Sequence, residues 1–171
     1  MRISILGMDY RSAIFAGCLS HRGHRVIGID TGSYRADWLD CFGECSPEPG
    51  LEVLLEHGRQ TGLLSRTTDL LTAVRETELT FMDGAAEDGG EQDATNMERL
   101  YRRIGEALRA KEGMHRLLVR SNRSRERILA TLLPILEKSS GKRLGQGFQL
   151  EVSADYLSAC SATLQARDQE T

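Results

Sequence analysis

Residues 1–30 read MRISILGMDYRSAIFAGCLSHRGHRVIGID, and this stretch decides the fold class. Residues 2–7 form a short apolar run that ends at a glycine, which is typical of a buried strand. Residues 11–22 carry apolar side chains at helical spacing, and Gly23 provides a natural helix stop. Residues 24–30 form a second apolar run that ends in an acid. The order strand, glycine turn, helix, strand predicts a right-handed βαβ unit.

The same alternation of strands and helices continues along the chain. We expect helices at 34–41, 50–57, 70–74 with Asp69 as the cap, 95–111, 123–138 and from about residue 154. We expect strands at 66–68, 79–82, 116–121 and 148–152. Residues 84–93 should form a polar loop. This pattern predicts an α/β fold: a Rossmann-like, doubly wound parallel sheet with helices on both faces. We expect one domain over residues 1–165, followed by a frayed tail over residues 166–171.

Composition narrows the classes of partner. The chain has 171 residues and a net charge of −3, so it has no general attraction to nucleic acid or to anionic membranes. Aromatic residues make up 5% of the chain, too few for base-stacking platforms. No apolar run is long enough to span a bilayer, and the four cysteines show no metal-finger spacing. We therefore expect a cytoplasmic protein with no structural metal.

The turn after the first strand is the place where a dinucleotide would bind in such a fold. A G-x-G-x-x-G turn lets the pyrophosphate approach the backbone at the N-terminus of the first helix. Here only Gly7 remains, because Asp9 and Ser12 stand at the second and third glycine positions. A carboxylate about 4 Å from a phosphate costs about 4 kcal/mol at an effective dielectric constant of about 20, or about a thousandfold in affinity. Ser12 is a milder change, because a small residue fits the helix–strand contact.

Two charged residues near this turn have alternative interpretations. Arg11 could offset the charge of Asp9, although a solvated first-turn position is the interpretation we favour. Asp30 follows the second strand, where an acid holds a ribose hydroxyl in dinucleotide-binding folds. A helix cap or a turn residue is the alternative for Asp30, and the context favours the ribose site.

These features together resemble the N-terminal NAD-binding domain of the UDP-glucose/GDP-mannose dehydrogenase family, most closely its bacterial GDP-mannose 6-dehydrogenase branch, which serves alginate synthesis. The resemblance covers nearly the whole chain. Its most specific stretches are residues 1–7, 16–20, 22–24, 26–30, 48–51, 57–63, 119–121 and 140–142.

The resemblance implies both a cofactor and a reaction. The family oxidises the C6 alcohol of a nucleotide sugar to a carboxylate by two hydride transfers to NAD, with a catalytic cysteine in a Phe-Gly-Gly-x-Cys setting. None of the four cysteines here stands in that setting, and a small buried hydrophobe is the interpretation that we favour for Cys18. Carried over position by position, the resemblance implies cofactor contacts from Gly7, Tyr10, Arg11, Asp30, Arg35, Gly84 and Ser121.

Other positions depart from the family pattern. Ala85 and Asn122 stand where the family has cofactor-contacting threonines, and residues 125–127 (Arg-Glu-Arg) replace its Pro-Gly-Thr. Asp155 aligns with the catalytic glutamate of the family but is one methylene shorter. We therefore expect NAD binding to be weakened by Asp9, Ser12, Ala85 and Asn122. We assign no catalytic residue, and we expect the chain not to bind a nucleotide sugar.

Three functions remain open at this point, of which we favour the first, with the second close behind. The first is a catalytically silent module that acts by protein contact, with a second copy or with a full-length dehydrogenase, through apolar surface that the rest of such an enzyme would cover. The second is a module that binds NAD(H) or a related nucleotide, as a sensor or as part of a split NAD-dependent oxidoreductase. The third is a gene remnant without a selected function, which predicts a marginal, aggregation-prone product.

Two remaining groups of side chains could be functional sites or could have only a structural or solvent-exposed role. Four arginines, Arg120, Arg123, Arg125 and Arg127, could form an anion site, but we favour a solvated helix face with Glu126 and Glu137 nearby. The four histidines, His21, His24, His57 and His115, show no metal-ligand spacing, and we expect His24 to be structural.

Overall fold

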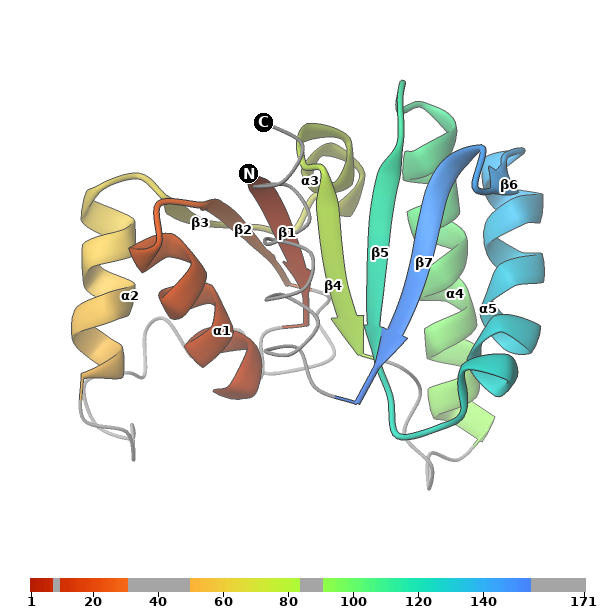
Figure 1. Ribbon diagram of the computed structural model, residues 1–171, viewed down its shortest axis with the longest axis horizontal. Coiled ribbons are helices and arrows are strands. Elements are labelled where there is room, and N and C mark those ends of the chain that lie inside the picture. Colours follow the sequence, from red (N-terminus) through yellow and green to blue (C-terminus); the bar gives the residue numbers. More distant parts are fainter. Residues whose placement is uncertain (8–9, 31–49, 84–90, 155–171) are drawn as a thin grey trace. The chain divides into compact units, whose positions relative to one another are not determined.

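The computed structural model describes residues 1–7, 10–30, 50–83 and 91–154 (Figure 1). The elements are β1 (Arg2–Leu6), α1 (Tyr10–His21), β2 (Arg25–Ile29), α2 (Leu51–Gln60), β3 (Leu64–Thr67), α3 (Leu70–Glu76), β4 (Leu79–Asp83), α4 (Glu91–Arg109), β5 (His115–Arg120), α5 (Arg125–Ser140), β6 (Arg143–Leu144) and β7 (Gly147–Ser153). The expected helix at 34–41, the helix after residue 154 and the tail at 166–171 lie outside the described residues.

The strands form one seven-stranded sheet in the order β3-β2-β1-β4-β5-β7-β6. The pairs β1–β2, β2–β3 and β5–β7 are parallel. This order is the 3-2-1-4-5-6 arrangement of dinucleotide-binding folds, with β7 in the sixth place and the two-residue β6 added outside it. The Rossmann-like parallel sheet expected from the sequence is therefore confirmed. The chain divides into two compact units, Met1–Thr80 and Phe81–Thr171.

In the first unit, α1 and α2 pack against each other, and each helix has a glycine at the contact. A Cβ atom at Gly17 of α1 would lie 3.4 Å from Leu54 Cβ on α2. A Cβ atom at Gly58 of α2 would lie 2.7 Å from the Ser20 hydroxyl on α1. Figure 1 shows the two helices side by side. The contact at Gly58 thus requires a glycine, whereas Gly17 lies at ordinary contact distance from the side chains of α2.

The short helix α3 begins where the sequence indicates. Asp69 is its N-cap, and the side chain accepts hydrogen bonds from Thr72 N at 3.1 Å and from the Thr72 hydroxyl at 2.6 Å. One of the orphan amides of the helix N-terminus is satisfied in this way. The expected capping role of Asp69 is confirmed.

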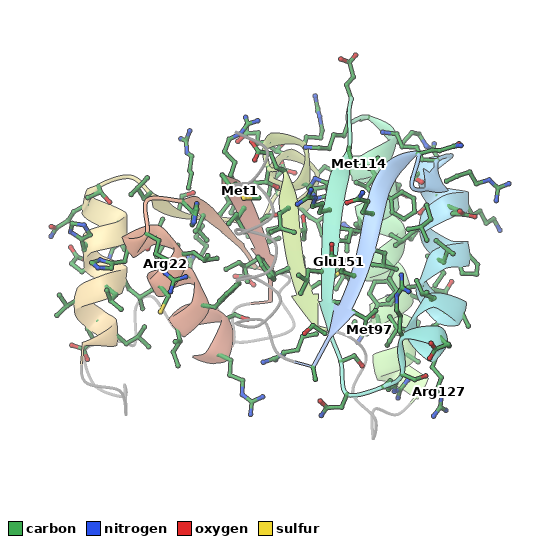
Figure 2. The ribbon with its side chains drawn as sticks, in the orientation of Figure 1. Met1, Arg22, Met97, Met114, Arg127 and Glu151 are labelled. Carbon is green, nitrogen blue, oxygen red and sulfur yellow. The ribbon has the colours of Figure 1, made fainter. Side chains whose placement is uncertain are left out.

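In the second unit, α4 and α5 pack against each other and lie behind β5 and β7 in the view of Figure 1. Phe148 and Leu150 of β7 are buried, whereas Gln149 and Glu151 between and after them are exposed. Figure 2 shows Glu151 on the face of β7 that points away from the two helices. This alternation is the one expected of a strand with one covered face.

Several element boundaries differ from those expected. The helix α4 begins at Glu91, so the last part of the expected polar loop at 84–93 is helical. The reason is that acidic residues are favourable in a first helical turn, so that a polar start does not exclude a helix. The helix α5 runs from 125 to 140 because Ser124 caps its start and Gly141 ends it in the left-handed region. The strand β6 was not expected, because two residues carry no readable period.

The described residues show little exposed apolar surface. Only Val53, Leu71 and Met114 are large hydrophobic side chains with high exposure among them, and they belong to three different places: α2, α3 and the start of β5. The apolar partner surface expected from the sequence stays a prediction.

Candidate functional site

The carboxyl ends of β1 and β2 bring together two residues predicted from the sequence. Leu6 and Ile29 are paired neighbours in the sheet, so the residues that follow them, Gly7 and Asp30, lie at adjacent strand ends. Gly7 has a φ of +79°, in the left-handed region that favours glycine, and its amide donates to Ile29 O at 3.2 Å. The chain therefore turns tightly as it leaves β1, as a phosphate-binding turn requires.

Asp30 is held at this edge by its backbone. Its amide donates to Thr67 O at 2.9 Å, which extends the β2–β3 pairing by one residue. Its side chain is half-buried. A carboxylate in this place can accept hydrogen bonds from a pair of ribose hydroxyls, the role that the position has in dinucleotide-binding folds. Sequence reasoning missed Thr67, whose part is played by a carbonyl that no side-chain pattern reveals.

The helix α1 begins directly after this turn. Arg11 is exposed, as expected for a solvated first-turn residue. Ser12 is only 1% exposed, so it lies in the helix–strand contact and not at a solvent-facing ligand position. Asp9 and the side chain of Tyr10 lie outside the described part of the chain. The third fingerprint position therefore keeps its packing role with a residue other than glycine.

The turn between β5 and α5 is the corresponding place in the second unit. The amide of Ser121 donates to Ser153 O at 2.9 Å, and the Ser121 hydroxyl accepts from Arg123 N at 3.1 Å. The Ser124 hydroxyl accepts from Arg127 N at 3.4 Å and caps α5. Asn122 is exposed. The two serines thus shape the turn, and Ser124 could have been recognised from the sequence as a serine placed just before a helical apolar pattern.

The first turn of α5 carries both signs of charge. Its own amide, the Ser124 hydroxyl and Arg125 together lower the pKa of Glu126 below its ordinary value. Arg125 and Arg127 are exposed, and Figure 2 shows Arg127 near the N-terminal end of α5. This agrees with a solvated helix face. Glu137, however, is near the other end of α5, where it contacts Arg143 at 2.8 Å, so its expected place beside the arginines is wrong.

Several expected site residues lie outside the described residues, namely Arg35, Gly84, Ala85 and Asp155. Cys18 is half-buried and has a free thiol, so it is less buried than expected. His24 Nδ1 lies 3.4 Å from the N-terminal amine, and His115 is fully buried. Within the described ranges, no helix could cross a bilayer and no group of three or more His, Cys, Asp or Glu side chains could hold a metal ion.

Comparison with known proteins decides the family. Residues 1–168 match the model of the UDP-glucose/GDP-mannose dehydrogenase family, NAD binding domain. The chain belongs to this family. A curated GDP-mannose 6-dehydrogenase from Pseudomonas aeruginosa is 39% identical over 164 residues, which cover 95% of this chain and 38% of that protein.

Solved structures agree with the family assignment. A ternary complex of GDP-mannose dehydrogenase from Pseudomonas aeruginosa superposes with a TM-score of 0.76 at 39% identity, covering 89% of this chain and 35% of that one. A UDP-glucose dehydrogenase from Pyrobaculum islandicum gives a TM-score of 0.68 at 27% identity, covering 88% of this chain and 34% of that one. The chain thus spans little more than a third of the length of the family members that it matches.

Proposed function

We propose that this chain is a dinucleotide-binding domain that has kept the adenosine half of its site and binds NAD weakly. The observation that supports this most directly is the pairing of Leu6 with Ile29, which places the left-handed Gly7 beside Asp30. A tight turn next to a ribose-binding acid is the arrangement that holds the adenosine part of a dinucleotide.

The weakening has its source in substitutions at ligand positions. Asp9 stands in the sequence at the second glycine position of the pyrophosphate turn, and Ala85 and Asn122 lack the hydroxyls of the threonines that the family has at their positions. Ser12 contributes least, because its buried side chain occupies a packing position. The charge of Asp9 therefore dominates, since repulsion between like charges acts directly on the phosphates.

We also propose that these 171 residues do not oxidise a nucleotide sugar by themselves. They contain no cysteine in the Phe-Gly-Gly-x-Cys setting, and Asp155 is one methylene shorter than the family's glutamate. From the family, we infer a connection with the synthesis of polysaccharide precursors. From the few cysteines without a disulfide or metal spacing, we infer a cytoplasmic location. Formation of NADH from NAD and GDP-mannose or UDP-glucose by the pure protein would contradict this inactivity.

Calorimetric titration with NAD tests the proposed site. We expect millimolar binding by the wild type and binding up to about a thousandfold tighter by Asp9→Gly, because the substitution removes the charge and restores a fingerprint glycine. Asp9→Asn separates the two effects, since it removes the charge but keeps most of the bulk. Asp30→Ala should abolish binding in the Asp9→Gly background.

A matched control excludes a general effect of net charge. Glu52→Gln removes one negative charge from an exposed first-turn position of α2 in the same unit, and it should leave NAD affinity unchanged. If neither wild type nor Asp9→Gly binds NAD at millimolar concentration, the proposal is wrong. Micromolar binding by the wild type would instead contradict the proposed weakening and favour a sensor or a split enzyme.

Action through protein contact is the second candidate. It is supported by the first turn of α5, where exposed Arg125 and Arg127 replace the family's Pro-Gly-Thr and present cations to solvent. The partner would be a second copy of the chain or a longer dehydrogenase with an acidic surface. Light scattering of the protein alone, and of its mixture with such a dehydrogenase, should show a complex that Arg125→Ala/Arg127→Ala weakens. A monomer in both measurements rules this candidate out.

A further inference from the structure

Two histidines from different helices lie face to edge on the surface of the first unit. His21 ends α1 and His57 is in the last turn of α2, and both are exposed. Their ring centroids are 6.2 Å apart and the ring planes meet at 65°. The sequence spacing of the histidines gives no sign of this pair, which exists only because α1 and α2 pack together.

The backbone positions of the pair are fixed by the helix contact beneath it. The Ser20 hydroxyl lies close to Gly58, at a point of close approach between the two helices. His21 and His57 are the sequence neighbours of these two residues, so their backbones lie beside this contact. Ser20 also donates a hydrogen bond to Gly17 O at 3.0 Å, which fixes its rotamer. The two imidazoles are therefore mobile only in their side-chain torsions, because the Cα atoms beneath them cannot separate without opening the core.

The distance between the rings fits a shared metal after a small change of rotamer. Transition metals bind imidazole nitrogen at about 2.0–2.1 Å, so two rings on one tetrahedral or square metal have centroids about 5 Å apart. Closing the gap from 6.2 Å requires only side-chain rotation, which is fast for exposed residues. Imidazole favours zinc, nickel and copper ions, and does not favour magnesium or calcium.

The surrounding charges are compatible with a cation. Both rings stand at the C-terminal ends of their helices, where the macrodipole attracts positive charge. Arg59, the cation nearest along α2, is 3.2 Å from Glu56 and is partly neutralised by it. Arg22 follows His21 directly and is exposed.

We propose that His21 and His57 form a surface site for a divalent transition-metal ion, with water in the remaining coordination positions. The site links the ends of α1 and α2. It is separate from the turn at Gly7, which lies at the opposite end of α1, and it does not depend on NAD.

Titration with nickel chloride, followed by calorimetry, tests the site on the full chain. One ion should bind per chain, and His21→Ala and His57→Ala should each weaken binding by at least about tenfold, as expected when a metal site loses an interaction that supports it. The double variant should bind nickel no more tightly than the weaker-binding single variant, because it has neither imidazole of the pair. The thermal midpoint of the wild type should rise with nickel, and the rise should disappear in both variants.

Two control variants identify the ligands. His24→Ala changes a histidine outside the pair and should leave nickel affinity unchanged. Cys18→Ser changes the thiol one helical turn before His21 and should also leave it unchanged. The proposal is overturned if nickel binds equally well to His21→Ala and His57→Ala, if Cys18→Ser alone abolishes binding, or if the wild type binds no nickel at millimolar concentration.

Discussion

Ser4 has a buried hydroxyl in the middle of β1, where an apolar residue would be the ordinary choice. The hydroxyl lies 3.0 Å from the Thr77 hydroxyl and 2.7 Å from the Thr80 hydroxyl, and all three residues are fully buried. Thr77 in turn donates to Ala73 O at 2.8 Å. These bonds join β1 to the end of α3 and to β4 through side chains, because a buried hydroxyl without a partner would be unfavourable.

Ser4→Ala should lower the free energy of unfolding by about 1–2 kcal/mol, because two buried threonine hydroxyls each lose a partner. Urea denaturation measures the change. Ser65→Ala, at an exposed position of β3, is the control and should be neutral within about 0.5 kcal/mol. Equal stability of Ser4→Ala and wild type would show that the threonines find other partners of equal strength.

Glu137 joins the end of α5 to β6 through a carboxylate that accepts hydrogen bonds at both oxygens. Leu144 N donates to Oε1 at 3.1 Å and Arg143 donates to Oε2 at 2.8 Å. The Leu144 amide, more than Arg143, lowers the pKa of this carboxyl below its ordinary value of 4.5. A lowered folded-state pKa means that the carboxylate stabilises the fold above the unfolded pKa, and that this contribution is lost as the pH falls through the folded pKa.

Glu137→Gln should therefore be less stable than wild type at pH 7, and the difference should shrink as the pH falls below 4.5. Denaturation curves at a series of pH values check this. Glu106→Gln on α4 removes an exposed carboxylate and provides the control for net charge. A stability difference that is constant from pH 7 to pH 3 would contradict the role of the ionised carboxylate.

At the same scale, the sequence indicated those candidate site residues whose side-chain type is informative. Gly7 and Asp30 could be predicted because a tight turn after a strand needs a glycine, and because an acid at the end of the next strand suits a ribose. Ser12 could be assigned to packing because its side chain is small. The Thr67 carbonyl and the contact of His21 with His57 could not be predicted, since backbone groups carry no side-chain signal and the contact depends on how two helices meet.

At the scale of elements, two interior helix glycines differ in how closely the neighbouring helix approaches them. Gly105 of α4 faces α5, and a Cβ atom there would lie 1.8 Å from Ser139 Oγ and 2.8 Å from Ser139 Cβ. The Ser139 carbonyl is held in turn by two bonds from Arg109, at 3.1 and 2.6 Å. At Gly17 the nearest atoms, 3.4–3.5 Å away, are at ordinary contact distance. The α4–α5 interface requires a glycine, whereas the α1 position tolerates a methyl group.

Gly105→Ala and Gly17→Ala should consequently change stability in opposite directions. We expect Gly105→Ala to lower the free energy of unfolding by about 1–3 kcal/mol through overpacking. We expect Gly17→Ala to raise it by up to about 1 kcal/mol, because alanine is the better helix former. Urea denaturation of both variants checks the pair, and adding Ser139→Ala to Gly105→Ala should restore part of the loss. Stabilisation by Gly105→Ala would mean that α4 and α5 have room for a methyl group between them.

The order of elements was predictable, because the spacing of apolar residues and the positions of glycines can be read directly from the sequence. The ends of the elements were less predictable. The start of α4 was placed too late because Glu91 and its polar neighbours resemble a loop, and β6 was missed because a two-residue strand exists only through its pairing with β7. Boundaries are set by caps such as Ser124 and Gly141, whose effect depends on the geometry around them.

At the scale of the whole molecule, folding and dinucleotide binding are linked. A ligand that binds only the folded chain raises its stability by an amount that depends on the ratio of ligand concentration to Kd. A dinucleotide brings a whole pyrophosphate to the turn at Gly7, whereas a mononucleotide brings a single phosphate, so the dinucleotide should stabilise the chain more. The size of the thermal shift therefore measures how much of the site is used.

With 1 mM NAD, the thermal midpoint of wild type should rise by about 1 °C or less, and that of Asp9→Gly by up to roughly 10 °C, since a thousandfold gain in affinity adds about 4 kcal/mol at this concentration. The shift on adding NAD is compared within each variant, because a new glycine also changes the entropy of the unfolded chain. AMP should shift Asp9→Gly by less than NAD does, because it carries one phosphate in place of two. Equal NAD shifts in wild type and Asp9→Gly would mean that the carboxylate at position 9 does not repel the phosphates, and that the site is limited by Ala85 and Asn122 instead.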